Sequence, residues 1–255
     1  MRVIDAHVHV GQWSHTDFLG RGASLDETLA VMDGAGVSGA AIMPTDRCDN
    51  AGLLAEASAA AGRGFALWFF AWVRPVDGGE PGRADLDWVE ANRDRVTGLK
   101  IHPSLSRQRV TGEGFAPALE LAEARGMVVV VHCGRWQEMA SYRFAIEAAR
   151  RHPRARFLLA HAGGDTPPLA TGAAEMVRAE GVDNVWFDLA GLREHWVIER
   201  NVALIGADRY LMGSDFNLAH PLMYIGQVRG MRLTDDQRQR ILSDNALGLL
   251  GEALR

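Results

Sequence analysis

Short runs of apolar residues alternate along the chain with longer stretches rich in alanine, leucine, glutamate and arginine. The short runs, followed by polar or glycine-containing loops, predict buried strands, and the longer stretches predict helices. The predicted strands end near His7, Ile42, Trp72, Lys100, His132, His161, Asp188 and Asp215. The predicted helices cover residues 25–34, 51–62, 115–126, 139–151, 168–179 and 235–250, and we expect residues 243–245 to cap the last of them.

The spacing of these strand ends is regular. Consecutive ends lie 27 to 35 residues apart, and one strand with its helix and loops needs about 30 residues. Eight such units predict an α/β protein with a single domain over residues 1–255, a closed (β/α)8 TIM barrel with helices at its C-terminal end. A doubly wound open sheet shares the alternation, but it usually carries a glycine fingerprint in its first turn, and this chain has none.

Charge and composition narrow the function. The 255 residues include 27 basic and 32 acidic side chains, a formal net charge of −5, which argues against a nucleic-acid or polybasic membrane-surface binder. No apolar stretch approaches the roughly 20 residues of a membrane helix, and residues 1–7 lack the apolar run of a secretory signal. Cys48 and Cys133 cannot build a disulfide framework. We therefore expect a cytoplasmic protein that acts on a small molecule.

Histidines and one aspartate gather at the predicted strand ends. His7 and His9 lie two residues apart on the first strand, so their side chains share one side. His132, His161 and Asp215 directly follow the apolar runs 127–131, 157–160 and 210–214. In a barrel these ends meet at one mouth. One histidine at a strand end is usually an ordinary buried or loop residue, but the five residues together predict a metal centre.

The residue types suit such a centre. Neutral imidazoles and a carboxylate are zinc ligands, and a catalytic site leaves one position for water, whose pKa the ion lowers to about 7. Asp215 could accept the proton of that water, and His161 could orient the water or polarise the substrate. Asp5, two residues before His7, and Asp188 are candidates for acceptors that hold a ligating histidine in place.

Seven motifs, five of which contain these residues, resemble the amidohydrolase superfamily, in particular its amidohydrolase-related branch of metal-dependent hydrolases and aminocarboxymuconate semialdehyde decarboxylase. They are IDAHVH at 4–9, GLKIHP at 98–103, VHCG at 131–134, LAHAGG at 159–164, FD at 187–188, GSDF at 213–216 and Asp244-Asn245-Ala246. The resemblance implies one divalent ion, zinc or less often manganese, and as its ligands His7, His9, His132 and Asp215. It further implies that His161 is the catalytic histidine and that the protein forms a homodimer.

Lys100 is the only lysine in the chain and every other basic residue is arginine, which favours a role at position 100 that needs an amine. In binuclear relatives a lysine on the fourth strand becomes a carbamate that bridges two metals, and the histidine at the position of His161 binds the second ion. The GLKIHP motif resembles the mononuclear branch instead, which favours a single ion. A salt-bridged lysine inside the mouth is the remaining alternative. His102 shares the side of Lys100 and could contact substrate or cap a helix.

The substrate is predicted only by class. Arginines that follow predicted strands could hold a carboxylate, and tryptophans could stack on a planar ring, although exposed loops carry many arginines without such a role. The candidates for binding a small, anionic substrate are Arg47, Arg74, Arg135, Arg193, Trp13, Trp72 and Trp136, of which Arg47, Arg135 and Trp136 are preferred, together with Lys100 and His102.

Three functions are possible, two of them reactions and one of them binding alone. Many decarboxylase relatives are longer than this chain, which favours hydrolysis of an amide, lactam, lactone or ester over non-oxidative decarboxylation of a small carboxylic acid. Phe216-Asn217 stands where many relatives have an aromatic residue followed by proline, so no particular substrate transfers. A barrel that only binds a metal or metabolite is the third possibility, because fold alone never establishes chemistry. His161 beside the ligands argues against it, since binding needs no acid–base group.

Overall fold

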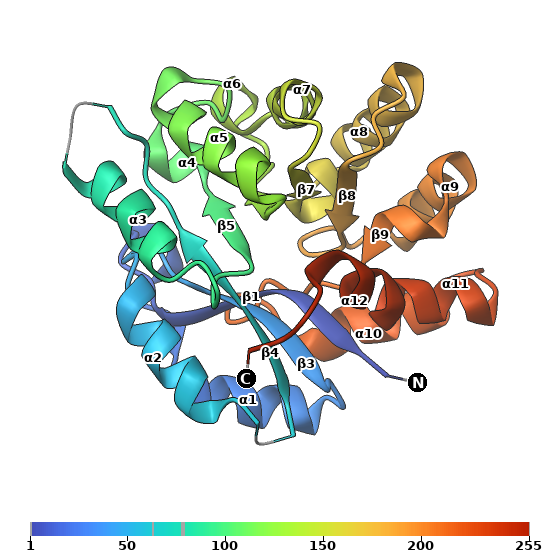
Figure 1. Ribbon diagram of the computed structural model, residues 1–255. Coiled ribbons are helices and arrows are strands. Elements are labelled where there is room, and N and C mark those ends of the chain that lie inside the picture. The colour runs from blue at the N-terminus through green and yellow to red at the C-terminus, as the bar shows by residue number, and fades with distance from the viewer. Residues whose placement is uncertain (1, 63, 78–79, 255) are drawn as a thin grey trace.

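The computed structural model describes residues 2–62, 64–77 and 80–254 (Figure 1). Within this part of the chain, eight parallel strands each pair with the next. They are β1 (Ile4–Gln12), β3 (Gly39–Pro44), β4 (Ala66–Trp72), β5 (Gly98–Ile101), β6 (Val128–Val131), β7 (Arg156–Leu159), β8 (Val185–Asp188) and β9 (Tyr210–Leu211). The predicted alternation is confirmed.

Backbone hydrogen bonds between the first strand and the segment after β9 close the ring. The amide of Ala6 donates to the carbonyl of Met212, and the amide of Asp215 donates to the carbonyl of His7, both at 2.9 Å. Val8 and Phe216 form a parallel bridge. The sheet is therefore a barrel, as predicted, and not an open doubly wound sheet. A short strand, β2 (Gly22–Ala23), pairs antiparallel with the last two residues of β1 and was not predicted.

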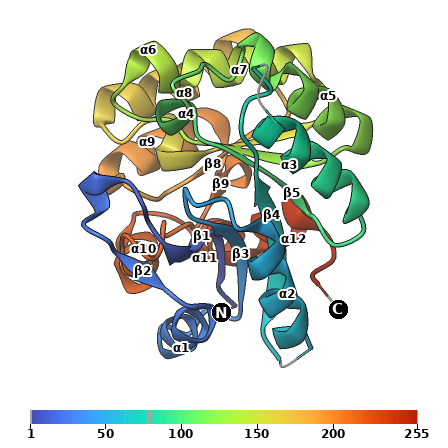
Figure 2. The same ribbon diagram turned by 90° about the vertical axis from the view of Figure 1, so that its left-hand side faces the viewer.

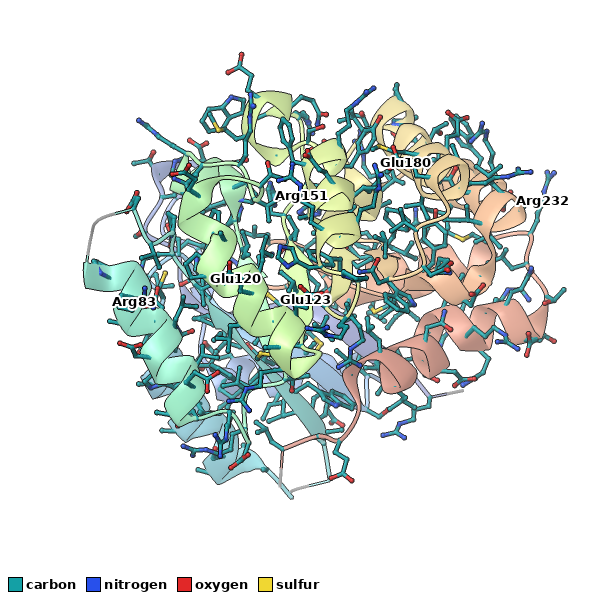
Figure 3. The ribbon with its side chains drawn as sticks, turned by 45° about the horizontal axis from the view of Figure 1, so that its top comes forward. Arg83, Glu120, Glu123, Arg151, Glu180 and Arg232 are labelled. Atoms are coloured by element: carbon teal, nitrogen blue, oxygen red, sulfur yellow. The ribbon has the colours of Figure 1, made fainter. Side chains whose placement is uncertain are left out.

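Helices lie around the outside of the strands (Figures 1 and 2). They are α1 (Leu25–Gly34), α2 (Asn50–Ala60), α3 (Glu80–Ala91), α4 (Pro103–Ser106), α5 (Ala116–Arg125), α6 (Gln137–Ala140), α7 (Tyr142–Arg151), α8 (Pro167–Glu180), α9 (His195–Ile205), α10 (Pro221–Gly230), α11 (Asp235–Gln239) and α12 (Asn245–Leu250). Charged residues of several outer helices, such as Arg83, Glu120 and Glu180, are exposed (Figure 3). None of the helices that the structure describes is long and apolar enough to cross a membrane.

Two predicted helices differ from the structure. The helix expected over 139–151 is broken at Ser141, whose backbone is extended (φ −70°, ψ 136°) and whose side chain caps α7 by accepting a hydrogen bond from the amide of Arg143. The cap expected at 243–245 is wrong. Asp244 is helical (φ −68°, ψ −37°), because a π-helical turn over Arg240–Asp244 joins α11 to α12 without interruption.

Buried apolar residues form two layers, one on each side of the strands. Neighbours along a strand fall in opposite clusters: Phe70 and Val130 belong to one, and Phe69 and Val129 belong to the other. Because side chains alternate across a strand, the cluster of Phe70 fills the barrel and the cluster of Phe69 lies under the helices. The interior is therefore a packed core up to the level at which polar side chains begin.

Candidate metal centre

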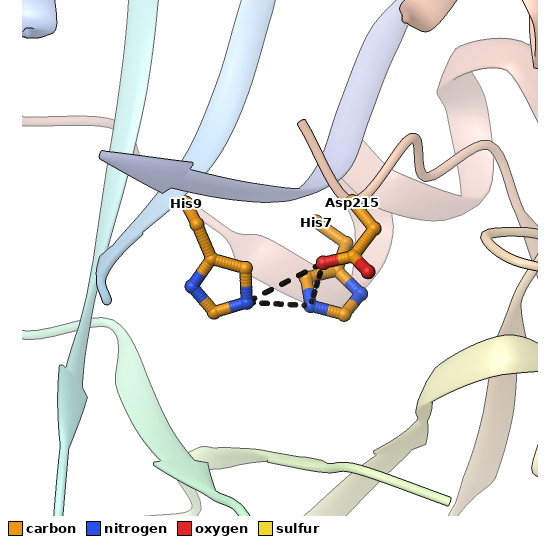
Figure 4. A group of neighbouring side chains, drawn as sticks. All are labelled: His7, His9 and Asp215. Carbon is orange, nitrogen blue, oxygen red and sulfur yellow. Dashed lines mark hydrogen bonds and ion pairs between the residues drawn. The ribbon is translucent and has the colours of Figure 1, made fainter. Parts of the chain in front are cut away.

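Three side chains converge at the mouth of the barrel: His7 and His9 from β1 and Asp215 from the segment after β9 (Figure 4). The Nε2 atoms of the two histidines lie 3.2 Å apart. Oδ1 of Asp215 lies 3.4 Å from Nε2 of His7 and 3.5 Å from Nε2 of His9. Both rings are buried, and the aspartate is partly open to the mouth.

Hydrogen bonds at Nδ1 of His7 and His9 determine the tautomer of each ring, and therefore whether Nε2 carries a lone pair. Nδ1 of His7 lies 2.9 Å from Oδ2 of Asp188, and Nδ1 of His9 lies 2.9 Å from the carbonyl oxygen of Pro44. Both partners only accept, so each ring carries its hydrogen on Nδ1 and a lone pair on Nε2. Two lone pairs and a carboxylate oxygen thus face one another, and this donor set fits a divalent cation.

Burial also favours the form of the histidines that binds metal. It lowers the pKa of His7 and His9 well below the usual range, because an imidazolium loses its hydration there and because the Lys100 ammonium lies nearby. Metal ligation requires the neutral imidazole. Both imidazoles therefore already have the tautomer and the charge that binding of a metal ion requires.

A bulge in β1 sets the direction of the His7 and His9 side chains, and it overturns the expected role of Asp5. Asp5 pairs with Ala40 and Val8 pairs with Ile42, so β1 advances three residues where β3 advances two. The extra residue breaks the alternation, and Asp5 does not share the side of His7. Its Oδ1 accepts instead from the backbone amides of His7, at 3.2 Å, and Ser214, at 2.9 Å. Asp5 thus ties β1 to the segment that carries Asp215 but holds no imidazole.

Asp188, at the end of β8, is the acceptor that holds a ligand. Its Oδ2 receives Nδ1–H of His7, and its Oδ1 accepts from the backbone amides of His161 and Ala190, each at 3.0 Å. One buried carboxylate therefore orients a histidine of the cluster and fixes the turn that carries His161.

Lys100 lies against the cluster. Its Nζ is 2.9 Å from Nε2 of His7, and the side chain is completely buried. Burial lowers the pKa of Lys100 to about 8, against the opposing pull of Asp215 and Asp188. Lys100 contacts His7 and does not contact His9. Among the described residues, no hydrogen-bond donor reaches Nε2 of His9, so the lone pair of that atom can bind a cation.

His161 and His132 form a second pair beside the cluster. Nδ1 of His161 lies 3.1 Å from the carbonyl oxygen of Ala190, which places the hydrogen on Nδ1, and Nε2 lies 3.1 Å from Nδ1 of His132. The ring of His132 also stacks on His102 at 3.8 Å between centroids. His132 is not one of the three residues whose ligand atoms all lie within 4.8 Å of one another.

Two of the six described non-glycine residues with left-handed backbone are candidate site residues. His161 has φ 59° and Asp215 has φ 56°, both in the left-handed region that costs a residue with a side chain about 1–3 kcal/mol. Such conformations persist where surrounding contacts impose them, here through Asp188 and the closing strand pair. The strain points to positions selected for side-chain direction.

A cavity of about 300 Å³ opens above the cluster. Its lining includes His9, Trp13, Phe18, Lys100, His102, His132, Arg135, His161, Asp165, Gly191, Asp215 and Leu218. Phe18, Asp165 and Gly191 were not predicted, because they lie on loops whose paths no local pattern reveals. Arg135 is present, but its Nε already binds Oδ2 of Asp165 at 2.8 Å.

Two of the three preferred substrate residues, Arg47 and Trp136, lie outside this cavity, and so do the candidates Arg74, Arg193 and Trp72. Arg47 donates to the carbonyl oxygen of Gln12 at 3.0 Å and lines a separate cavity of about 200 Å³. Trp136 does not line the cavity, and it is 41% exposed. Each follows a strand end, as expected, but the loops direct both side chains elsewhere.

Comparison with known proteins identifies the class to which this barrel with its histidine–aspartate cluster belongs. The family model described as amidohydrolase matches residues 4–251, so the chain belongs to the amidohydrolase family of enzymes. A search of curated protein sequences gives no match.

Solved structures with the same fold come from decarboxylases and hydrolases. 5-Carboxyvanillate decarboxylase LigW from Sphingomonas paucimobilis is 16% identical with a TM-score of 0.72 over 98% of both chains. A candidate 2-pyrone-4,6-dicarboxylic acid hydrolase from Pseudomonas putida is 21% identical, with a TM-score of 0.73 over 98% of this chain and 97% of that chain. Dihydroxybenzoic acid decarboxylase from a Polaromonas species, with bound manganese and 2-nitroresorcinol, is 13% identical, with a TM-score of 0.71 over 98% and 96%. At these identities the likeness concerns the fold.

Proposed function

We propose that this protein is a metal-dependent hydrolase that cleaves an amide, lactam, lactone or ester bond in a small molecule. The observation that carries the proposal is the convergence of two Nε2 lone pairs and a carboxylate oxygen from His7, His9 and Asp215. One divalent ion would be held there, zinc or else manganese, with His132 as the fourth ligand. The manganese of the Polaromonas decarboxylase supports a divalent ion in this fold.

The chain's own residues have distinct parts in the proposed reaction. A bound divalent ion would supply Lewis acidity and lower the pKa of a water molecule. Asp215 would accept the proton of the attacking water, because its carboxylate both faces the two histidines and lines the cavity. His161 is neutral, since burial lowers its pKa, and its Nε2 would pass the proton taken up by Asp215 to the leaving group across the cavity that both residues line.

The cations that line the cavity suit a small carbonyl compound that carries a carboxylate. Lys100 contacts the uncharged Nε2 of His7, so its own charge is not neutralised by that contact, and Arg135 is bound to Asp165 only through Nε. Both cations therefore support the anionic substrate expected from the sequence. Hydrolysis is the proposed reaction, and decarboxylation of such an acid is its alternative.

Metal analysis and the His161→Asn variant test this function together. We expect about one zinc or manganese per chain in both proteins, and loss of turnover only in the variant, because His161 handles protons and does not bind the ion. Release of the carboxylic acid product from a panel of lactones, esters and amides is followed by liquid chromatography, and carbon dioxide release from carboxylated aromatics is measured in parallel.

The alternatives give different results in the same experiment. Carbon dioxide release without acid release would replace hydrolysis by decarboxylation. Nearly two ions per chain would indicate a carboxylated Lys100 and a binuclear site. Unchanged turnover in His161→Asn would contradict the role of that residue, and a protein that binds the ion but converts no substrate would be a binding barrel.

Compartment and assembly complete the proposal. Cys48 and Cys133 are both free thiols, which supports a cytoplasmic, reducing environment. The homodimer follows from the family resemblance alone, and sedimentation of the purified protein tests it.

A further inference from the structure

The peptide unit between Ala190 and Gly191 is held on both sides. Its carbonyl oxygen, from Ala190, accepts the hydrogen of Nδ1 of His161 at 3.1 Å. Its N–H group, from Gly191, donates to the hydroxyl oxygen of Tyr224 at 2.7 Å. Tyr224 comes from α10, is only 5% exposed and does not line the cavity.

A planar peptide transmits position from one side to the other. The carbonyl and the N–H of one trans peptide point in opposite directions on a rigid plate, so fixing the N–H also fixes the direction of the carbonyl. Gly191 permits this arrangement, because it has φ +75° and a Cβ there would lie 3.0 Å from Nδ1 of His161. The tyrosine hydroxyl, the peptide and the imidazole thus form one chain of hydrogen bonds, in which each bond polarises the next.

We propose that Tyr224 is a positioning residue for His161, acting through the Ala190–Gly191 peptide to hold the imidazole in its Nδ1–H tautomer and in its orientation at the cavity. The inference rests on the proposed function only where it concerns turnover. The tautomer and the ring position are properties of the protein alone.

Removal of the hydroxyl has a definite consequence. In Tyr224→Phe the N–H of Gly191 loses its acceptor, and the peptide gains freedom to rotate toward water or another partner. Its carbonyl then no longer fixes the hydrogen of His161 on Nδ1, so Nε2 ceases to be a constant acceptor toward His132 and the cavity.

A second hydrogen bond from α10 provides a matched control. Nε2 of Gln227 donates to the carbonyl oxygen of Leu192 at 3.0 Å, so it ties the same helix to the same loop through a different peptide. Gln227→Met removes this bond without touching the peptide that holds His161. If α10 merely stabilises the loop, the two variants will behave alike.

The test is long-range 1H–15N correlation spectroscopy of the histidine side chains, with His161→Asn identifying the resonances of His161. We expect the Nδ1–H pattern in the wild type and in Gln227→Met, and a shift toward the averaged pattern of mixed tautomers in Tyr224→Phe. Gly191→Ala is the second variant, and its added methyl group should displace the same resonances. An unchanged His161 pattern in a folded Tyr224→Phe would overturn the proposal.

Kinetics separate this proposal from the proposed function. With a substrate in hand, kcat should fall about tenfold or more in Tyr224→Phe with KM and metal content retained, and should remain at the wild-type value in Gln227→Met. A tautomer shift in a protein without hydrolase activity would sustain the positioning role and reject the function. A tautomer shift with unchanged kcat would reject the positioning role in catalysis.

Discussion

The two ends of the barrel interior contain opposite kinds of side chain, apolar at one end and ionisable at the other. Toward the amino ends of the strands, Ile4, Phe70 and Val128 are completely buried in an apolar cluster. Toward the carboxyl ends, buried positions are occupied by ionisable groups such as Lys100 and Asp188. Burial serves packing at one end and the tuning of pKa and hydrogen bonds at the other. Stability and chemistry are thereby separated along the strands, and substitutions can test how complete the separation is.

The largest expected effect on stability is at the apolar end. Phe70 is fully buried, and its ring lies so close to Gly98 that a Cβ there would come within 2.4 Å of it. Phe70→Ala leaves a cavity and should lower the free energy of unfolding by about 3–5 kcal/mol. Urea denaturation measures this loss, and elemental analysis of the folded fraction should show unchanged metal per chain. A loss of metal with little loss of stability would show that the two ends are not independent.

An intermediate effect is expected at the polar end, from Asp188→Asn. An amide turned to accept from the backbone of His161 presents its NH2 group to Nδ1–H of His7, so the ligand loses its acceptor. Metal affinity should fall about 10–100-fold, measured by competition with a chelator. Asp183→Asn, whose side chain is 95% exposed, is the matched control and should bind metal like the wild type. Equal affinities in both variants would exclude Asp188 as a support of the metal centre.

The smallest effect is expected at the rim of the mouth. Trp136 is half-exposed and lies outside the lining of the cavity. Trp136→Ala should change the free energy of unfolding by less than about 0.5 kcal/mol and leave KM unaltered. Denaturation and steady-state kinetics measure both quantities. A large increase in KM would show that this loop covers the substrate and that the interpretation from sequence was correct.

The strand pattern could be predicted because each buried strand is a short apolar run between polar loops. Positions of strand ends were harder to obtain. The first strand was expected to end near His7, yet β1 continues to Gln12, since its last residues pair with β2. Helices α3, α9 and α10 were not predicted. The first of them begins with Glu80-Pro81-Gly82, a sequence that local propensity does not associate with a helix.

The site residues also divide into those that the sequence predicts and those that it does not. The cluster of His7, His9 and Asp215 follows from strand ends that must meet. Asp5 was misplaced, because a bulge of one residue inverts the side to which a side chain points and leaves no mark on the sequence. Tyr224 could not be found either, since its contact with Gly191 depends on how a helix packs on a loop 33 residues away.

Closure of the barrel by the Val8–Phe216 bridge has a consequence for the time at which the site forms during synthesis on the ribosome. Asp215 follows His9 by 206 residues, so at about 5–20 residues per second the ribosome needs roughly 10–40 s to supply the carboxylate after the histidines. During this interval the growing chain has no complete cluster to offer an ion. An ion held by all three residues would therefore bind only after both the first strand and the segment that follows β9 have been made, and it would join these two parts of the barrel.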